Sequence, residues 1–221
     1  MNNKVVAGKN VAFKVTYNDN NWQGICSNKI ASYNFKTRIW CKKQSITKYN
    51  CQSDFWKKIK LDKNTFPCFD SVSLLNNEPS FYAGHYHGKE HSNEPIRSLY
   101  IKPNKIAIFT SRNPEDPESQ RFIFFIGIIN DVKTFIDKNG NQFNTYHCEP
   151  ETGIIFKNIY PKYWDFYSNR NNPNRFAWNT GLFRYWSDEQ VKNLLEWVSS
   201  KRRYTKKNNK KAEFLLKHFF K

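Results

Sequence analysis

Three histidines lie within seven residues of one another in the turn-rich stretch "YAGHYHGKEHSNEP". His85 and His87 are separated by one residue, so in an extended chain their imidazoles would point the same way and could share a metal ion. His91 or a cysteine would complete the site. The stretch has no second ligand pair at a standard spacing, and histidines in a polar loop are more often exposed or hydrogen-bonded. A metal site at His85, His87 and His91 is therefore the alternative prediction, and it would indicate a metal-dependent nuclease or other hydrolase.

Five cysteines are spread along the chain without close pairs, at Cys26, Cys41, Cys51, Cys68 and Cys148. The first four could form a zinc site, but their spacings of 15, 10 and 17 residues lack the paired Cys-x-x-Cys pattern that marks such sites. An odd cysteine count is also not typical of a secreted disulfide scaffold. We predict reduced, packed thiols and no resident cofactor, with zinc as the alternative.

Acidic clusters that could hold a divalent cation are found in two stretches, "NPEDPES" and "NDVK". In the first, Glu115, Asp116 and Glu118 lie in a proline-bounded loop, where carboxylates are usually solvated. In the second, Asp131 and Lys133 have no partner carboxylate at a defined spacing. The chain also lacks a catalytic triad pattern, a glycine-rich phosphate loop and a His-Glu-x-x-His motif. The sequence therefore favours a binding protein over an enzyme.

The net charge indicates what such a protein would bind. The 221 residues contain 36 Lys and Arg against 19 Asp and Glu, a formal charge of +17. Nucleic acid is the favoured partner, because clustered cations gain affinity for a phosphate backbone through counterion release. An anionic membrane surface is the alternative. No apolar stretch approaches the ~20 residues that span a bilayer, and no signal-peptide segment opens the sequence, so we expect a cytoplasmic protein without membrane contact.

Basic residues interleaved with aromatic rings are the second indication of nucleic acid. They are densest in "YPKYWDFYSNRNNPNRFAW" and "FKTRIWCKK". In such stretches Lys and Arg can neutralise phosphates while Trp and Tyr stack on exposed bases, each stack contributing ~1–3 kcal/mol in single-strand binders. Several of the seven tryptophans must nevertheless belong to the core, because a domain of this size cannot leave them all exposed.

The elements that would position these residues are mainly strands. "VAFKVTY" alternates and predicts a strand with Val11, Phe13 and Val15 on one face. "IAIFTS" and "RFIFFIGIINDV" enclose a charged loop and predict an antiparallel hairpin. Asn139-Gly140 predicts a type I′ turn between two further strands.

A helix is predicted near the C-terminus, where Ser187 and Gln190 fit a capping box. The apolar residues that share its face are Val191, Leu194, Leu195 and Val198. The last 23 residues contain nine Lys or Arg and one Glu. We therefore expect one globular nucleic-acid-binding domain over residues 1–198, followed by a basic extension over 199–221 for which a helix is one option.

The stretch "IKPNKIAIFTSRNPEDPESQRFIFFIGIINDV" resembles the core hairpin of the PUA-like superfamily, which includes the EVE, ASCH and YTH domains. The likeness covers about 30 of the 221 residues. "WQGIC", Cys41 and "FPCFDS" follow an order similar to an uncharacterised N-terminal domain that precedes helicase or nuclease domains in prokaryotic defence proteins. Here the spacing between the first two cysteines is longer.

This resemblance implies an α+β fold with a mainly antiparallel, twisted or barrel-like sheet and flanking helices. It also implies a module that recognises DNA in preference to RNA, in a restriction or defence context, with a modified base flipped into an aromatic pocket. The effector nuclease or helicase would be a separate domain or subunit. A basic adaptor whose tail binds another protein is a further alternative. The predicted base-stacking residues are Trp22, Trp40 and Trp178, and the predicted phosphate contacts are Arg38, Lys42, Lys43, Arg112, Arg170 and Arg175.

Overall fold

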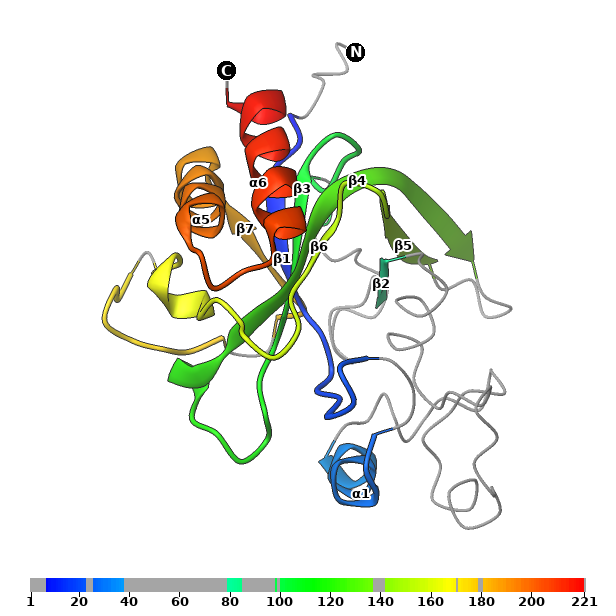
Figure 1. Cartoon of the computed structure of the whole chain (residues 1–221). Helices are drawn as coiled ribbons and strands as arrows, with labels where there is room; N and C mark the ends of the chain where they lie inside the picture. The colour runs from blue at the N-terminus through cyan, green and yellow to red at the C-terminus, as the bar shows by residue number, and fades with distance from the viewer. Residues whose placement is uncertain are drawn as a thin grey trace.

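The computed structural model contains one curled, seven-stranded sheet with two helices packed against one face (Figure 1). The residues that it describes are 7–22, 26–37, 79–84, 98, 100–136, 142–169, 171–178 and 181–220. The described strands are β1 (Asn10–Lys14), β2 (Ser80–Gly84), β3 (Ile106–Ser111), β4 (Phe122–Ile136), β5 (Gln142–Cys148), β6 (Ile154–Ile155) and β7 (Phe183–Trp186). The described helices are α1 (Asn28–Thr37), α5 (Asp188–Ser200) and α6 (Lys206–Phe219), with 3₁₀ turns η2 (Glu118–Gln120) and η3 (Tyr163–Asp165).

The strand order is β2-β5-β4-β3-β1-β7, and β6 pairs with β4 beside this path. Among the described strands, the β1–β3 pair is parallel and the other pairs are antiparallel. The predicted α+β class with a mainly antiparallel sheet is therefore confirmed. In the part of the chain that is described, the sheet is open, with β2 at one edge and β7 at the other.

The centre of the sheet, formed by β1, β3 and the first half of β4, has both faces buried. The predicted strand at β1 and the predicted hairpin of β3 and β4 are both present. Every residue of β3 is buried, and its side chains alternate between two cores. Ile106 and Ile108 belong to a helix-side core, whereas Ala107 and Phe109 belong to an aromatic core on the opposite face. Val11, Phe13 and Val15 share the aromatic core, as their spacing predicts.

A β-bulge in β4 breaks this alternation. Phe109 is opposite Phe125 and Thr110 is opposite Ile123, so Phe124 is an extra residue in the ladder. Phe124 and Phe125 consequently both enter the aromatic core. Phe124 stacks on the indole of Trp22, with ring centroids 3.7 Å apart. The bulge thus adds a second ring to this core from one short stretch of β4.

The far half of β4 bends toward β5, which lets the sheet curl on itself. A second register shift, between Ile129 and Asp131, marks the point where β4 turns to pair with β5. The ring of Phe13 on β1 then stacks on Phe81 of β2, with centroids 4.3 Å apart, although three strands separate β1 from β2 in the sheet order. The curl closes the aromatic core between the two ends of the sheet.

The other face of the central strands is covered by α5 and α6. The predicted capping box at Ser187 and Gln190 is present, and the four apolar residues predicted on that face are all fully buried. The C-terminal segment forms α6, whose Ala212 and Leu215 are fully buried in the same helix-side core. Residues 206–219 are therefore part of the packed body. None of the described helices is long and apolar enough to cross a bilayer.

Replacing Gly127 with Ala should destabilise the fold by about 1–3 kcal/mol, the usual cost of overpacking a core. A Cβ at Gly127 would lie 2.6 Å from Cζ of the buried Phe125 ring. Gly181→Ala is the control, since its Cβ would make an ordinary contact of 3.6 Å with the Phe183 carbonyl oxygen. Urea unfolding measures both variants, and equal midpoints would contradict this packing.

Candidate nucleic-acid interface

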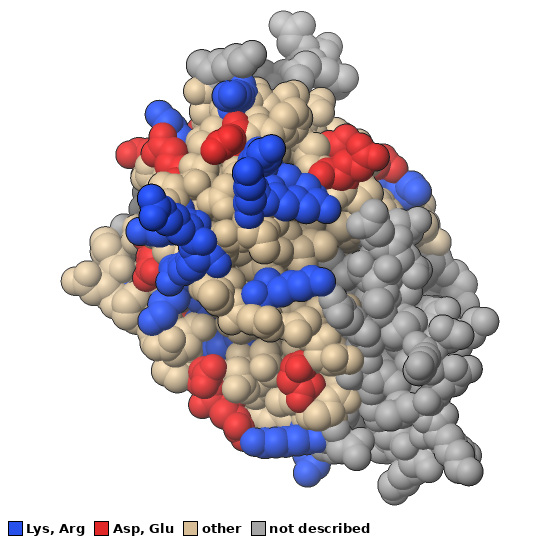
Figure 2. All heavy atoms as spheres, viewed as in Figure 1, with Lys and Arg blue, Asp and Glu red and all other residues tan. Residues whose placement is uncertain are grey.

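A cleft of about 640 Å³ lies between the first half of α6 and the segment that contains β6. Its charged lining is unbalanced, with Lys157, Arg203, Lys207 and Lys211 against the single carboxylate of Glu151. Figure 2 shows Lys and Arg side chains gathered on this face, over the region where Figure 1 places α5 and α6. The cleft is therefore a site of uncompensated positive charge.

Hydrogen bonds at the α5–α6 turn hold the wall of the cleft in place. The Asn209 amide donates to three carbonyl groups at the end of α5, those of Val198 at 2.9 Å, Ser199 at 2.8 Å and Lys201 at 3.2 Å. The Val198 carbonyl also accepts from the Lys201 N–H, and the Lys201 carbonyl from the Tyr204 N–H, so the Asn209 side chain adds bonds to a turn that the backbone already closes. The two helices are thereby fixed to each other at the point where the basic turn begins.

Two further bonds cross from α6 to the β6 side. The Asn208 amide donates to the Ile155 carbonyl at 3.0 Å, and the Lys211 ammonium donates to the Gly153 carbonyl at 2.5 Å. Burial and the neighbouring Lys207 lower the pKa of Lys211, and Glu151 partly opposes this. Burial is the larger cause, and Lys207 adds a smaller repulsion between two cations of the cleft that a bound anion would relieve.

Arg203 is held in position by aromatic rings. Its guanidinium carbon lies 4.7 Å from the centre of the Trp197 ring and 5.5 Å from that of Tyr204. Cation–π contacts of this kind use the flat face of the guanidinium and leave its N–H edges available. Arg203 is thus a pre-positioned donor at the entrance to the cleft, although the residue as a whole is exposed.

The outward face of α6 continues the basic surface. Lys206, Lys210, Phe214 and Lys217 follow one another at spacings of four, four and three residues, which places them on one side of a helix. All four are exposed, and the Phe214 ring is 48% accessible. From Lys206 to Lys217 this stripe runs for about 16 Å at the helical rise per residue. We refer to these four residues as the α6 stripe.

The two predicted stacking residues that are described, Trp22 and Trp178, are both core residues in this structure. Trp22 is 2% exposed, stacks on Phe124, and donates from Nε1 to the Thr16 carbonyl at 3.1 Å. Trp178 is 1% exposed and donates from Nε1 to the Gly181 carbonyl at 2.6 Å. A base could not stack on either indole without displacing the side chains packed against it. Both tryptophans therefore serve core packing in this structure.

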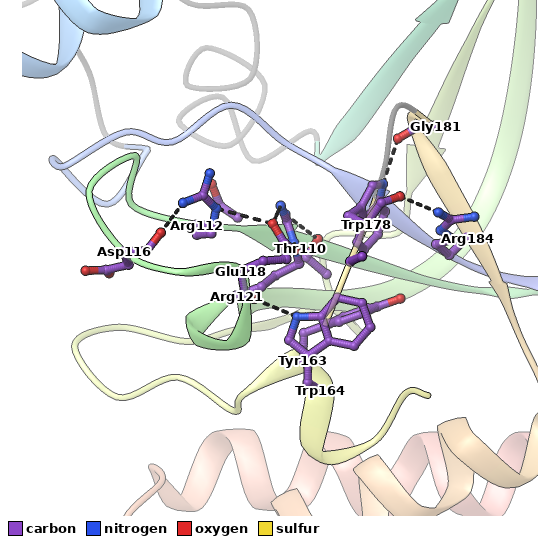
Figure 3. A network of polar contacts seen from close by, with 12 residues as sticks. Thr110, Arg112, Asp116, Glu118, Arg121, Tyr163, Trp164, Trp178, Gly181 and Arg184 are labelled. Carbon is purple, nitrogen blue, oxygen red and sulfur yellow. Dashed lines mark hydrogen bonds and ion pairs between the residues drawn. The ribbon is translucent and has the colours of Figure 1, made fainter. Parts of the chain in front are cut away.

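Trp178 and the predicted phosphate contact Arg112 belong to one buried network (Figure 3). Its centre is Arg121, which is 2% exposed and bonds both carboxylate oxygens of Glu118, at 2.5 and 3.1 Å. The Arg121 guanidinium lies 4.7 Å from the centre of the Trp178 ring. Arg112 also pairs with Glu118, at 3.3 Å, and donates to the Asp116 carbonyl. Here these residues secure the loop that precedes β4.

Of the other predicted site residues, one is described by the structure and the rest lie outside the described ranges. Arg175 is exposed in the segment before Trp178. Neither Trp22 nor Arg175 contributes to the lining of the cleft. The predicted residues that lie outside the described part of the chain are Trp40, Arg38, Lys42, Lys43, Arg170, His85, His87, His91, Cys41, Cys51 and Cys68.

No group of three or more His, Cys, Asp or Glu side chains within the described ranges is arranged to hold a metal ion. The two cysteines in those ranges, Cys26 and Cys148, are buried and form no disulfide. Burial raises the pKa of Cys148 well above the ordinary value of a thiol, so it remains protonated and packs as an apolar side chain.

Sequence reasoning missed the cleft as a site, although its signal was present. The many Lys and Arg after residue 198 predict a basic extension. In the structure, part of that segment forms one wall of the cleft. The apolar residues Ala212 and Leu215, three apart, were the sign that this segment packs on the body. Lys157 and Glu151 lie on the opposite wall, and the sequence around them has no motif that would mark them as part of a site.

Comparison with models of protein families, with curated proteins and with solved structures finds no match to this chain.

Glu118→Gln should destabilise the protein by about 2–4 kcal/mol, because removing one member of a largely buried ion pair leaves the other charge uncompensated. Glu196→Gln is the control. Glu196 pairs with Lys192 at 3.8 Å, and both side chains are half exposed, so the loss should be about 0.5 kcal/mol or less. Chemical denaturation of both variants tests the difference, and a Glu118→Gln loss no larger than the control would show that Arg121 does not need its carboxylate.

Proposed function

We propose that this protein binds nucleic acid through the basic cleft and the adjoining α6 stripe. The observation that carries the proposal is the charge of the cleft, where four cations face one carboxylate. Between residues 201 and 219 there are eight Lys or Arg and one Glu, and most of these cations are exposed. A phosphate backbone supplies the repeated negative charge that such a surface requires.

The shape of the surface supports a polymer as the ligand. The cleft brings four cations together, and the α6 stripe extends the positive surface by about 16 Å along the helix. Several phosphates of one strand could therefore be bound together. Phe214 lies among the cations of the stripe and is half exposed, so its ring is available to contact a base or sugar.

The finer predictions from the PUA-like resemblance remain proposals. They are a preference for DNA, recognition of a modified and flipped base, and an effector nuclease or helicase in a defence or restriction context. Neither Trp22 nor Trp178 offers an aromatic face for such a base in this structure. The support for nucleic-acid binding therefore comes from the phosphate-binding surface, and base selection stays a separate question.

Lys207→Gln should weaken binding to a DNA duplex and lower the slope of log affinity against log salt by about 0.9, the change expected when one phosphate contact is lost. Lys207 is exposed and lines the cleft. Lys36→Gln is the matched control, because Lys36 is an exposed lysine on α1, which Figure 1 shows at the end of the molecule opposite the C-terminus. Fluorescence anisotropy at several salt concentrations measures both variants.

The same titration with RNA and with anionic phospholipid vesicles separates the alternatives. Tighter binding to DNA than to RNA would support the DNA preference. Binding to vesicles without binding to either oligonucleotide would contradict the proposed function and favour a membrane surface as the partner. Equal salt slopes for Lys207→Gln and Lys36→Gln would show that the cleft does not contact phosphate.

A further inference from the structure

Apolar side chains are exposed among the cations of the cleft. Ile155 and Ile159 both line it, and they are 38% and 42% exposed. Lys157 lies between them in the chain and is exposed in the same cleft. Single exposed apolar residues are common on protein surfaces, but here two of them line one basic cleft. Phosphate alone is bound by charge and hydrogen bonds, so this lining fits a ligand that also has an apolar surface.

Arg203 adds a flat surface to the same cleft. Its guanidinium carbon lies 4.7 Å from the centre of the Trp197 ring and 5.5 Å from that of Tyr204. These rings restrict the orientation of the guanidinium, while the residue as a whole remains exposed. The guanidinium plane of arginine is one of the surfaces on which proteins stack unpaired bases.

Phe214 lies one helical turn beyond the cleft on the same side of α6. It follows Lys207 and Lys211, which line the cleft, at spacings of seven and three residues. The Phe214 ring is 48% exposed and stacks on His218, with centroids 5.8 Å apart and 19° between the ring planes. A strand that leaves the cleft along α6 would therefore pass over a ring that is already held in one orientation.

The size of the cleft separates unpaired from paired nucleic acid. Its volume of about 640 Å³ is within the range of roughly 300–1,000 Å³ that small-molecule sites have, which suits one nucleotide. In a duplex the face of each base is covered by its neighbours, so neither Ile159 nor Phe214 could reach one. The bases of a single strand can turn outward and contact such side chains.

We propose that the cleft and Phe214 bind unpaired nucleotides, so that this protein prefers single-stranded nucleic acid to a duplex. One base packs against the isoleucines and Arg203 in the cleft, and a second stacks on Phe214, while Lys157 and Lys207 bind the phosphates beside them. The inference rests on the proposed function, which it deepens by naming the form of nucleic acid. Charge alone predicts the opposite preference, because a duplex has the higher density of phosphates.

Fluorescence anisotropy of the full chain tests this with three DNA ligands of equal length. They are a mixed-sequence single strand, its blunt duplex, and a strand of abasic residues that keeps every phosphate. The mixed-sequence strand should bind about fivefold more tightly than either of the others, or tighter still, because only it offers base faces. Anionic phospholipid vesicles that bind more tightly than this strand would assign the exposed isoleucines to acyl chains and overturn the inference.

Phe214→Ala should weaken binding of the single strand about tenfold, as the loss of one stacked base predicts. Its salt slope should stay unchanged, because no phosphate contact is removed. Binding of the duplex should change by about twofold or less. Phe135→Ala is the matched control, since Phe135 is also 48% exposed but lies on the far half of β4 and does not line the cleft.

Ile159→Ala is a second variant, within the cleft itself. It should weaken single-strand binding about threefold, because it removes apolar area that a base would cover. Ile136→Ala is its control, an isoleucine that is 73% exposed at the end of β4. Duplex binding as tight as single-strand binding, or equal affinities for Phe214→Ala and Phe135→Ala, would overturn the inference. The Lys207→Gln salt slope with the duplex would then still decide the proposed function, whereas no binding to any DNA would overturn both.

Discussion

Both faces of β1, β3 and the first half of β4 are buried, and this constraint determines how the rest of the chain must be arranged. A strand pair with apolar side chains on both faces needs two separate covers. On one face the far half of β4 bends away and brings β5 and β2 over Phe13. On the other face α5 and α6 supply the cover. The basic α6 is therefore needed to complete the body of the protein.

The cleft follows from this requirement. Helix α6 buries Ala212 and Leu215 in the core, so its opposite side must face solvent, and the sequence places Lys206, Lys210 and Lys217 there. Its first half also lies beside β6, because Asn208 and Lys211 bind backbone carbonyls in that segment. A cation-rich helix is thereby fixed against the body, and its first residues, Lys206 and Lys207, stay exposed to solvent. The same packing that stabilises the sheet presents the charge.

Much of this fold can be predicted from local patterns. The strand that contains Val11 and Phe13, the hairpin of β3 and β4, and the capped helix after Ser187 each have a clear period or capping signal, and each is present. The bulge at Phe124 could not be predicted, because an unbroken apolar run reads the same with or without an extra residue. The curl of the sheet depends on contacts between distant strands, which no local pattern contains.

The binding residues are harder to predict than the fold, because a side chain can bind a ligand only if it is exposed, and the sequence does not show which side chains are exposed. A tryptophan beside arginines looks the same in sequence whether it stacks on a base or on Arg121, and Trp178 does the latter. Arg112 similarly pairs with Glu118 and holds a loop. The basic surface instead includes residues that the sequence assigned to a tail, because the role of Ala212 and Leu215 as anchors depends on a core formed elsewhere.

The most direct test of the account is to label exposed lysines with an amine-reactive reagent, with and without a bound DNA duplex, and to locate the labels by mass spectrometry. Binding through the cleft and the α6 stripe predicts that Lys157 and Lys207 in the cleft and Lys210 in the stripe become protected, while Lys29 and Lys36 on α1 are labelled as before. Protection of the α1 lysines with unchanged labelling of α6 would contradict the account.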